Sequence, residues 1–395
     1  MLIFDIFLQK GVNYLLLLLV PIYFGVDVFN QLMLALTIVG LTSQIQHLGI
    51  EAIAVREFQK DQTNIQRIRL IKILASIIAA LVYALAIGWI ATRSDPGLAL
   101  FIPLAIVVFL AGEVSIIASH SQSVNKYRGF VRVRMLASLL TAVLKATAIL
   151  LFSSISLFVL GYLLNSVLIV IIYRFGKKTY NQFKIAVDIP YQKNLISKNF
   201  PIFLGALSFS VLHRVDIIML QMMGWQGAVG SYSFAAQTLD VFVLLFLAYL
   251  SNVTGPLFRL TSKPKKQNFL YQRLRRRFVG MSLAVSILAS VAASGLLFFE
   301  LSNVYKGIVV SFIILTPALS LMVYRHLQSK MIVIKKIPSL SMSSNIIALF
   351  FNIIFNFLLI PQYGTWAAAV TTFFSILISV ILVEVGLCRK NKIQP

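Results

Sequence analysis

A small set of charged residues interrupts long apolar stretches of the sequence, and these residues could do chemistry. The six are Lys10, Glu113, Lys145, Arg214, Asp216 and Asp240. A charge inside a lipid bilayer is costly and usually faces a cavity or a partner, so each is a functional candidate if its stretch crosses a membrane. A cation in such a place can bind an anionic group, and an acid can neutralise that cation or carry a coupling proton.

Arg214, Asp216 and Asp240 are expected to lie near one another. Counted from the loop between the stretches 201–222 and 230–253, Arg214 lies about 8 residues deep (roughly 12 Å) and Asp240 about 10 residues deep (roughly 15 Å). One interpretation is an ion pair of Arg214 with Asp240 or Asp216 that holds helices together. The other is that Arg214 presents a cation to an anionic substrate while one of the acids tunes it or carries a coupling proton.

The other three charges also have a structural and a functional interpretation. Lys10 shares a helix face with Asn13 and Tyr14, and it either extends to the lipid headgroups or faces a cavity. Lys145 lies near the middle of its stretch, which favours a water-filled cavity or a buried acidic partner. Glu113 could be that partner, could take part in proton coupling, or could form an ordinary pair between helices.

The sequence lacks the patterns that most enzymes and metal sites need. It contains no nucleophile elbow, P-loop, metalloprotease helix, EF-hand or dinucleotide fingerprint. The four histidines lie in four different stretches, and the single cysteine, Cys388, excludes a cysteine-based zinc site. We therefore expect no catalytic residues, no metal and no cofactor.

The composition identifies the class of protein that must position these charges. The chain has 395 residues, of which 59% are hydrophobic and 12% charged, against about 45–50% and about 25% in soluble domains. The net charge of +23 would suggest a nucleic-acid partner in a soluble protein. Membrane proteins, however, concentrate Lys and Arg in cytoplasmic loops. The sequence therefore predicts an all-α, polytopic membrane protein that binds no nucleic acid.

Twelve apolar stretches are expected to be transmembrane helices, since each has about the ~20 residues that a bilayer requires. They are roughly 3–24, 30–50, 70–91, 98–119, 134–153, 155–173, 201–222, 230–253, 278–299, 307–327, 340–360 and 364–387. Most of the 35 Lys and Arg residues fall in alternate loops and in the C-terminal tail, while the opposite loops hold only Arg93 and Lys306. This asymmetry predicts that both termini are cytoplasmic.

The longest central polar stretch divides the chain into two halves. We expect an N-terminal lobe of six helices at 1–175, a cytoplasmic connecting segment at 176–200, and a C-terminal lobe of six helices with a basic tail at 201–395. The six outer connections are all short. A membrane glycan polymerase generally places its chemistry on a long external loop, so this chain offers no obvious place for such a site.

Three stretches of sequence resemble a known family. They are RVDIIML at Arg214–Leu220 followed by VGSY at Val229–Tyr232, the pattern LIPQYG at Leu359–Gly364 after an Asn-rich helix, and LGIE at Leu48–Glu51. These stretches resemble the bacterial polysaccharide (O-antigen type) flippases of the multidrug/oligosaccharidyl-lipid/polysaccharide exporter superfamily. Ala367 replaces a glycine that is usual in the family, a small-for-small change that preserves close helix approach.

The resemblance implies a fold and a cargo. Family members have two six-helix lobes around a central cavity that alternates between the two faces of the membrane. Their cargo is an undecaprenyl-pyrophosphate-linked oligosaccharide, destined for surface polysaccharide such as O-antigen, capsule or exopolysaccharide. Lys10 and Arg214 would then line the cavity, with Lys145 as a third cation, and would hold the pyrophosphate, which suits a guanidinium fork. Tyr14 and Tyr232 are candidates for stacking on sugar rings, although interfacial aromatic belts explain most membrane tyrosines.

Two other functions are considered besides that of an inner-membrane flippase, which makes no bond and is not an enzyme. A cation-coupled multidrug exporter of the same superfamily would usually be longer and would rely on acidic cavity residues. A membrane glycan polymerase would need the external loop and the catalytic residues that this chain lacks. Beyond the lipid-linked cargo and membrane lipids, the partners expected for a flippase are a polysaccharide polymerase or other assembly proteins.

Overall fold

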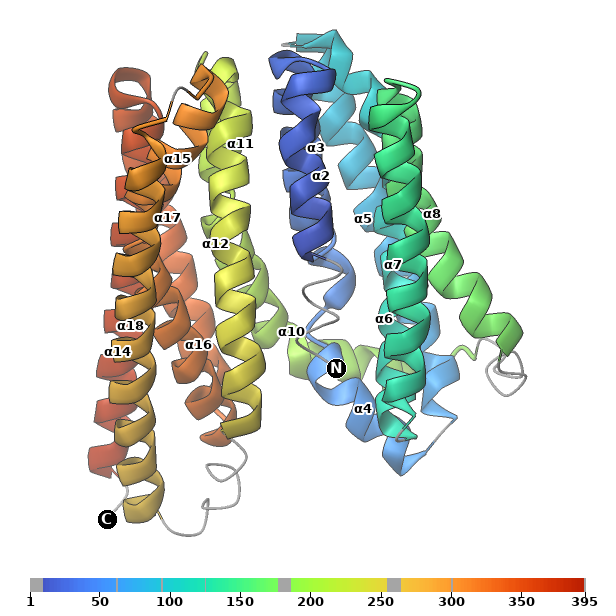
Figure 1. Cartoon of the computed structure of the whole chain (residues 1–395). Coiled ribbons are helices and arrows are strands. Elements are labelled where there is room, and N and C mark those ends of the chain that lie inside the picture. The colour runs from blue at the N-terminus through green and yellow to red at the C-terminus, as the bar shows by residue number, and fades with distance from the viewer. Residues whose placement is uncertain are drawn as a thin grey trace. The chain divides into compact units, whose positions relative to one another are not determined.

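A computed structural model describes residues 10–61, 63–93, 95–124, 126–176, 186–253, 264–299 and 301–393, and within these ranges the chain is helical and has no strand. It divides into two compact units, Met1–Leu207 (unit 1) and Ser208–Pro395 (unit 2). Each unit is made of long apolar helices that pack side by side (Figure 1). The expected all-helical, polytopic class is confirmed.

Unit 1 contains most of the N-terminal helices and a buried core at one end. Its elements are α2 (Val12–Tyr23), α3 (Val26–Thr42), η2 (Ile45–His47), α4 (Glu51–Lys60), α5 (Asn64–Arg93), η3 (Pro96–Leu104), α6 (Ala105–Ser123), α7 (Tyr127–Leu150), α8 (Ile155–Gly176) and the first part of α10 (Ile189–Leu212). The core joins α4, α5, α7, α8 and α10 through the side chains of Phe58, Ile68, Phe130, Tyr173 and Leu195. It fixes the short helix α4 and the start of α10 to the long helices.

Unit 2 continues from the end of α10 to the C-terminus. Its elements are α11 (Val215–Met222), α12 (Gln226–Val253), α14 (Pro264–Leu296), α15 (Asn303–Leu315), α16 (Ala318–Ile334), α17 (Pro338–Tyr363) and α18 (Thr365–Ile393). α17 and α18 form a tight hairpin through the turn at Gly364, and α15 and α16 are bent by 51° at their junction. Pro317, which lies at that junction, explains the break because proline cannot donate a backbone hydrogen bond.

The number of membrane spans agrees with the expectation of about twelve. In the described part of the chain, ten helices are long and apolar enough to cross a membrane, or up to eleven if α15 and α16 form one bent span. α2 is apolar as well but shorter. It belongs to the expected stretch 3–24, whose first residues lie outside the described ranges.

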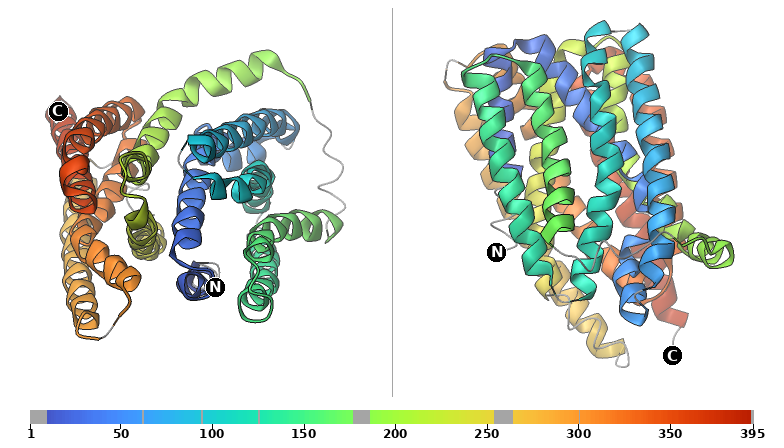
Figure 2. Two further views of the ribbon diagram at one scale, coloured as in Figure 1. Left: turned by 90° about the horizontal axis from the view of Figure 1, so that it is seen from above. Right: turned by 90° about the vertical axis from the view of Figure 1, so that its right-hand side faces the viewer.

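The structure corrects the expected start of the seventh stretch. We expected a helix from Pro201, because the apolar run begins there after the polar connecting segment. Instead α10 begins at Ile189 and contains Pro201 in its interior, so that part of the expected connecting segment 176–200 is helical. The first part of α10 is roughly perpendicular to the long helices of unit 1, and two views at right angles agree on this direction (Figures 1 and 2).

The turn between α17 and α18 depends on Gly364, and we expect a substitution there to destabilise unit 2. Gly364 has φ +55°, and a Cβ atom built on it would lie 2.7 Å from ring carbons of Trp225. A Gly364→Ala change must therefore shift the tryptophan ring as well as adopt an unfavourable backbone conformation, at a cost of order 1–3 kcal/mol. We expect Gly364→Ala to lower the midpoint temperature, which is the temperature at which half of the purified protein is no longer monodisperse.

Gly227 offers a matched control for this measurement. It lies in the first turn of α12, where an added Cβ would meet nothing within 4 Å. Gly227→Ala is expected to leave the midpoint unchanged or slightly raised, because alanine favours a helix over glycine. Equal midpoints for Gly364→Ala and the unaltered protein would contradict the role assigned to this turn.

Candidate functional site

Unit 2 contains a break in an apolar helical stretch beside Arg214. α10 ends at Leu212 and α11 begins at Val215, so that His213 and Arg214 lie between two helical pieces. The expectation of one continuous helix over 201–222 is therefore wrong at this point. Transporters commonly build binding sites from discontinuous helices of this kind, because the break leaves backbone groups available to a ligand.

Asp216 lies in the first turn of α11 and is almost completely buried, with 1% of its surface exposed. The Tyr232 hydroxyl of α12 donates a hydrogen bond to Oδ2 at 2.5 Å, and the Thr372 hydroxyl of α18 donates to the same oxygen at 3.0 Å. The Ile217 N–H donates to Oδ1 at 2.8 Å. All three donors are uncharged, so in the described part of unit 2 no cation is in direct contact with this carboxyl group.

A chain of polar side chains extends from Thr372 into the interior of unit 2. The Asn352 amide of α17 donates to the Thr372 hydroxyl oxygen at 3.3 Å, and the Asn356 amide donates to the Asn352 side-chain oxygen at 2.8 Å. The Thr371 hydroxyl in turn contacts the Asn356 side-chain oxygen. All four side chains are buried. Their hydroxyl and amide groups suit a proton or a small monovalent cation and are too enclosed to bind a sugar.

Arg214 and Asp240 form the ion pair that one interpretation of the sequence anticipated. The Arg214 Nη2 atom lies 2.8 Å from Asp240 Oδ2, and the two side chains are 20% and 37% exposed. Together with His213, Asp216 and Tyr232 they line an enclosed cavity of about 20 Å³, which is room for about one water molecule. In this conformation the partly exposed ion pair, and not the cavity behind it, is the part of the site that a large anionic ligand could contact.

Lys145 lies inside unit 1 and its ammonium group is enclosed. The residue is 2% exposed, and its Nζ atom donates to the Asn13 side-chain oxygen at 2.8 Å and lies 3.3 Å from the centroid of the Tyr162 ring. Phe158 contributes a second ring at 5.8 Å. An added Cβ at Gly161 would lie 2.6 Å from the lysine stem, so the small residue makes room for it. These contacts link α2, α7 and α8.

Of the three alternatives considered for Glu113, the structure shows the ordinary pair between helices and not a pair with Lys145. The Glu113 carboxylate accepts hydrogen bonds from both Nε and Nη2 of Arg69, at 3.0 and 2.9 Å. Both nitrogens donate to the same carboxylate oxygen, Oε1, and the two hydrogen bonds are charge-assisted. Since Arg69 and Glu113 belong to α5 and α6, Glu113 forms the ordinary pair between helices that the sequence also allowed.

The remaining candidates differ in their exposure. Lys10 is exposed at the beginning of the described chain, and Tyr14 is half-buried in α2. Tyr232 has no exposed surface, and its hydroxyl binds Asp216. Tyr232 is therefore not placed to stack on a sugar ring in this structure, which corrects the expectation for that residue.

The sequence analysis missed two groups of residues at these sites. Asn13 and Tyr162 surround Lys145, while Asn352 and Thr372 extend the Asp216 cluster. Asn352 had a signal, since it and the next asparagine, four residues later, lie on one face of an apolar helix, and polar groups in such helices are functional candidates. No feature of the sequence marked Thr372 as a functional candidate, because isolated threonines are common in membrane helices.

The profile of one protein family, described as "Polysaccharide biosynthesis protein", matches residues 1–261. No curated protein matches the sequence of the chain. The matched residues include all of unit 1, the helix break and the Arg214–Asp240 pair.

Solved structures of transporters share the fold across nearly the whole chain. An inward-facing multidrug resistance transporter of the MATE family, in the MOP superfamily, has a TM-score of 0.72 at 13% identity and covers 99% of this chain and 96% of that chain. The lipid II flippase MurJ in an inward closed conformation has a TM-score of 0.71 at 16% identity, with coverages of 97% and 86%. A MOP superfamily transporter from Pyrococcus furiosus has a TM-score of 0.62 at 14% identity, with coverages of 99% and 94%.

Proposed function

Because the chain belongs to the polysaccharide biosynthesis protein family, we propose that it flips undecaprenyl-pyrophosphate-linked oligosaccharide repeat units across the bacterial cytoplasmic membrane by alternating access. The repeat units would serve the assembly of a surface polysaccharide such as O-antigen, capsule or exopolysaccharide. The fold that the chain shares with a lipid II flippase supports this choice. No covalent bond is made or broken, so the protein acts as a transporter and not as an enzyme.

The observation that carries the proposal is the chemistry of the break between α10 and α11. A partly exposed guanidinium, that of Arg214, lies beside a buried carboxyl group, that of Asp216, in one short stretch of chain. The guanidinium is a planar, permanently charged donor that binds phosphate groups through two parallel hydrogen bonds. We assign Arg214 to the pyrophosphate of the cargo, with Asp240 as the partner that it exchanges during transport.

Lys10 supplies a second accessible cation in the proposed mechanism. It is exposed, whereas the ammonium group of Lys145 is enclosed by Asn13 and aromatic rings. We therefore assign Lys10 to the pyrophosphate as well, and Lys145 to the packing of α2 against α7 and α8. The isoprenoid tail would remain in the bilayer, where many of the exposed side chains of the described helices are large and apolar.

Asp216 is the candidate for energy coupling. A buried carboxylate carries a desolvation penalty of several kcal/mol, and Arg214, which lines the same cavity, hydrogen-bonds to Asp240 and not to Asp216. Three hydrogen bonds from neutral donors to the charged group, at roughly 1.5–3 kcal/mol each, offset a penalty of that size. The charged and neutral forms are then close in free energy. Binding of a proton or a small cation to this carboxyl group can therefore be coupled to a change in the conformation of unit 2.

The lipid extract of a strain that lacks the protein tests the proposed function. We expect mass spectrometry to show accumulated undecaprenyl-pyrophosphate oligosaccharide together with loss of the surface polysaccharide, and restoration of both by the intact gene. Unchanged lipids with new sensitivity to toxic compounds would instead indicate a multidrug exporter. Unchanged lipids with short, unpolymerised surface glycan would indicate an enzyme such as a polymerase, and either result would refute the flippase assignment.

A further inference from the structure

The first part of α10 is an amphipathic helix whose inward face is fixed to unit 1. Arg67 of α5 forms an ion pair with Asp188 at 3.1 Å and lies over the ring of Tyr191 at 5.2 Å from its centroid. The Gln192 amide donates to the Arg67 backbone oxygen at 3.2 Å. One turn further on, Leu195 is 7% exposed within the core shared with α4 and α5. These contacts fix the rotation of the helix about its own axis.

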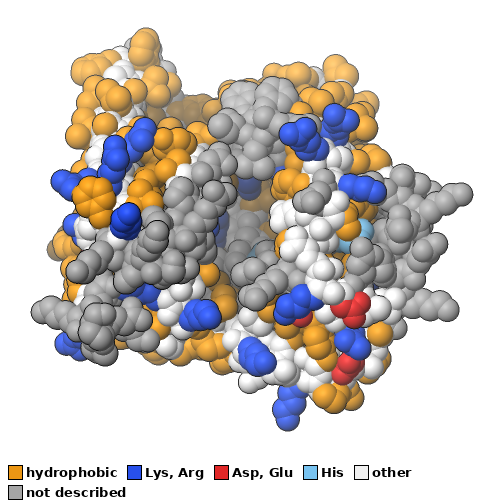
Figure 3. Space-filling view, turned by 90° about the horizontal axis from the view of Figure 1, so that it is seen from below, with side chains coloured by type: hydrophobic (Ala, Val, Ile, Leu, Met, Phe, Trp, Pro, Cys, Tyr) orange, Lys and Arg blue, Asp and Glu red, His pale blue; other side chains and the backbone are white. Residues whose placement is uncertain are grey.

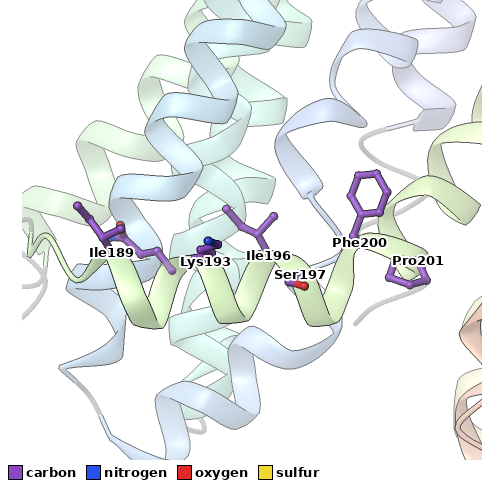
Figure 4. Close-up of a pocket in the computed structure, with 7 residues that line it drawn as sticks. Ile189, Lys193, Ile196, Ser197, Phe200 and Pro201 are labelled. Carbon is purple, nitrogen blue, oxygen red and sulfur yellow. The ribbon is translucent and has the colours of Figure 1, made fainter.

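The opposite face of the same helix is apolar and exposed. Ile189, Ile196 and Phe200 are 67%, 37% and 49% exposed. With Lys193 they follow the spacing i, i+4, i+7 and i+11, which places them on one side of a helix. They line a shallow groove of about 540 Å³, to which Ser197 contributes a hydroxyl group (Figure 4). All of the lining residues belong to α10, and the groove is open on its outer side.

The direction of α10 and the charge around it indicate what this face meets. The first part of the helix lies beside the long helices of unit 1 and roughly perpendicular to them (Figure 2), as a helix does when it lies in the plane of a membrane surface. Seen from below, Lys and Arg outnumber Asp and Glu among the charged side chains that are visible (Figure 3). By the positive-inside rule this is the cytoplasmic side, where the leaflet is rich in anionic lipids.

We propose that the outer face of α10 binds an anionic phospholipid of the cytoplasmic leaflet. The phosphate group is held by the Lys193 ammonium and the Ser197 hydroxyl, and the acyl chains pack on Ile196 and Phe200. Charge complementarity favours this occupant, because the exposed Lys193 ammonium lies between the apolar side chains that would meet the acyl chains. The site does not depend on the identity of the transported cargo.

A lipid at this site would act on the segment that joins the two units. The division between unit 1 and unit 2 falls between Leu207 and Ser208, inside α10. Phe200 and the adjacent Pro201 therefore lie less than three helical turns from the division at ~3.6 residues per turn. Holding the first part of the helix at the membrane surface limits how that segment can move.

A fluorescent label beside the groove provides the test. The exposed Cys388 is replaced by Cys388→Ser, and Asn194→Cys, exposed on α10 and outside the groove, carries an environment-sensitive fluorophore. The full-length protein is placed in vesicles that contain nitroxide-labelled phosphatidylglycerol or nitroxide-labelled phosphatidylcholine. We expect phosphatidylglycerol to quench at a several-fold lower mole fraction than phosphatidylcholine, with no competition from inorganic phosphate.

Variants of two lysines on the same helix distinguish binding at a defined site from a general effect of surface charge. Lys193→Gln is expected to weaken quenching by phosphatidylglycerol at least fivefold, because it removes a hydrogen bond to a charged phosphate group. Lys198→Gln removes the same charge from an exposed position outside the groove and should change quenching less than twofold. Equal quenching by both lipids, equal effects of both lysine variants, or competition by inorganic phosphate would overturn the proposal. Absence of quenching by either lipid would overturn it too and favour a protein partner.

Discussion

Asp216→Asn is expected to abolish coupled flipping while leaving a folded protein in the membrane. The substitution keeps the size and shape of the side chain but fixes it in a neutral form. The hydroxyl groups of Tyr232 and Thr372, which now donate to Oδ2 at 2.5 and 3.0 Å, can rotate to accept hydrogen bonds from the new amide. The Ile217 N–H keeps its acceptor. The network thus stays satisfied, and the alternation between charged and neutral forms is lost.

The expected effect on transport is large. If the gain or loss of one buried charge drives the conformational change, its removal costs on the order of 2.7 kcal/mol of coupling, or about a hundredfold in the coupled rate. The measurement is the rate at which lipid-linked oligosaccharide in reconstituted vesicles becomes accessible to an external glycosidase. It is made with an imposed proton gradient, with a sodium gradient and with neither, so that the coupling ion is identified in the unaltered protein.

Tyr232→Phe is the matched control for Asp216→Asn. It removes one hydrogen bond to the carboxyl group, worth roughly 1.5–3 kcal/mol when the acceptor is charged, but it leaves the titratable group in place. We expect a rate that still responds to the gradient, with a changed dependence on pH or sodium concentration. If Asp216→Asn kept both the rate and the response to the gradient, Asp216 would be a structural group and coupling would have to be sought elsewhere.

Much of the fold could be predicted from the sequence because the bilayer imposes it. Apolar stretches of about twenty residues must be helical in a membrane, since no water is present to satisfy their backbone, and the basic loops then set the topology. The depth of Arg214 and Asp240, counted at a fixed rise per residue, predicted that these residues could meet. They do so at 2.8 Å.

The features that could not be predicted depend on tertiary contacts or on local backbone choices. The residues at the break, His213 and Arg214, do not include a glycine or a proline, so no local signal marked it. The partner of Lys145 is Asn13, 132 positions away in the sequence. Because the amide of Asn13 is neutral, charge complementarity could not identify it as the partner. The start of α10 at Ile189 was missed because the residues before Pro201 are largely polar, and the polar stretch was taken for a connecting segment.

Arg214→Ala is expected to reduce flipping about ten- to a hundredfold without reducing the amount of protein in the membrane. A hydrogen bond to a charged group contributes roughly 1.5–3 kcal/mol, and each 1.4 kcal/mol corresponds to about a factor of ten. The pair with Asp240 is partly exposed, at 20% and 37% for the two side chains, so its loss costs the fold little. Complementation of surface polysaccharide in the deletion strain, with immunoblots of the membrane fraction, measures both quantities.

A double substitution distinguishes the contact with cargo from the ion pair. Arg214→Met combined with Asp240→Leu replaces the pair by apolar side chains of similar volume, which leaves no charge unpaired. If the arginine only holds α12 against the helix break, the double variant should flip lipid at nearly the normal rate. If the guanidinium binds the pyrophosphate, the double variant stays inactive, whereas Asp240→Asn alone, which releases the cation from its partner, retains activity. Restoration by the double variant would remove Arg214 from the binding site and leave the family assignment intact.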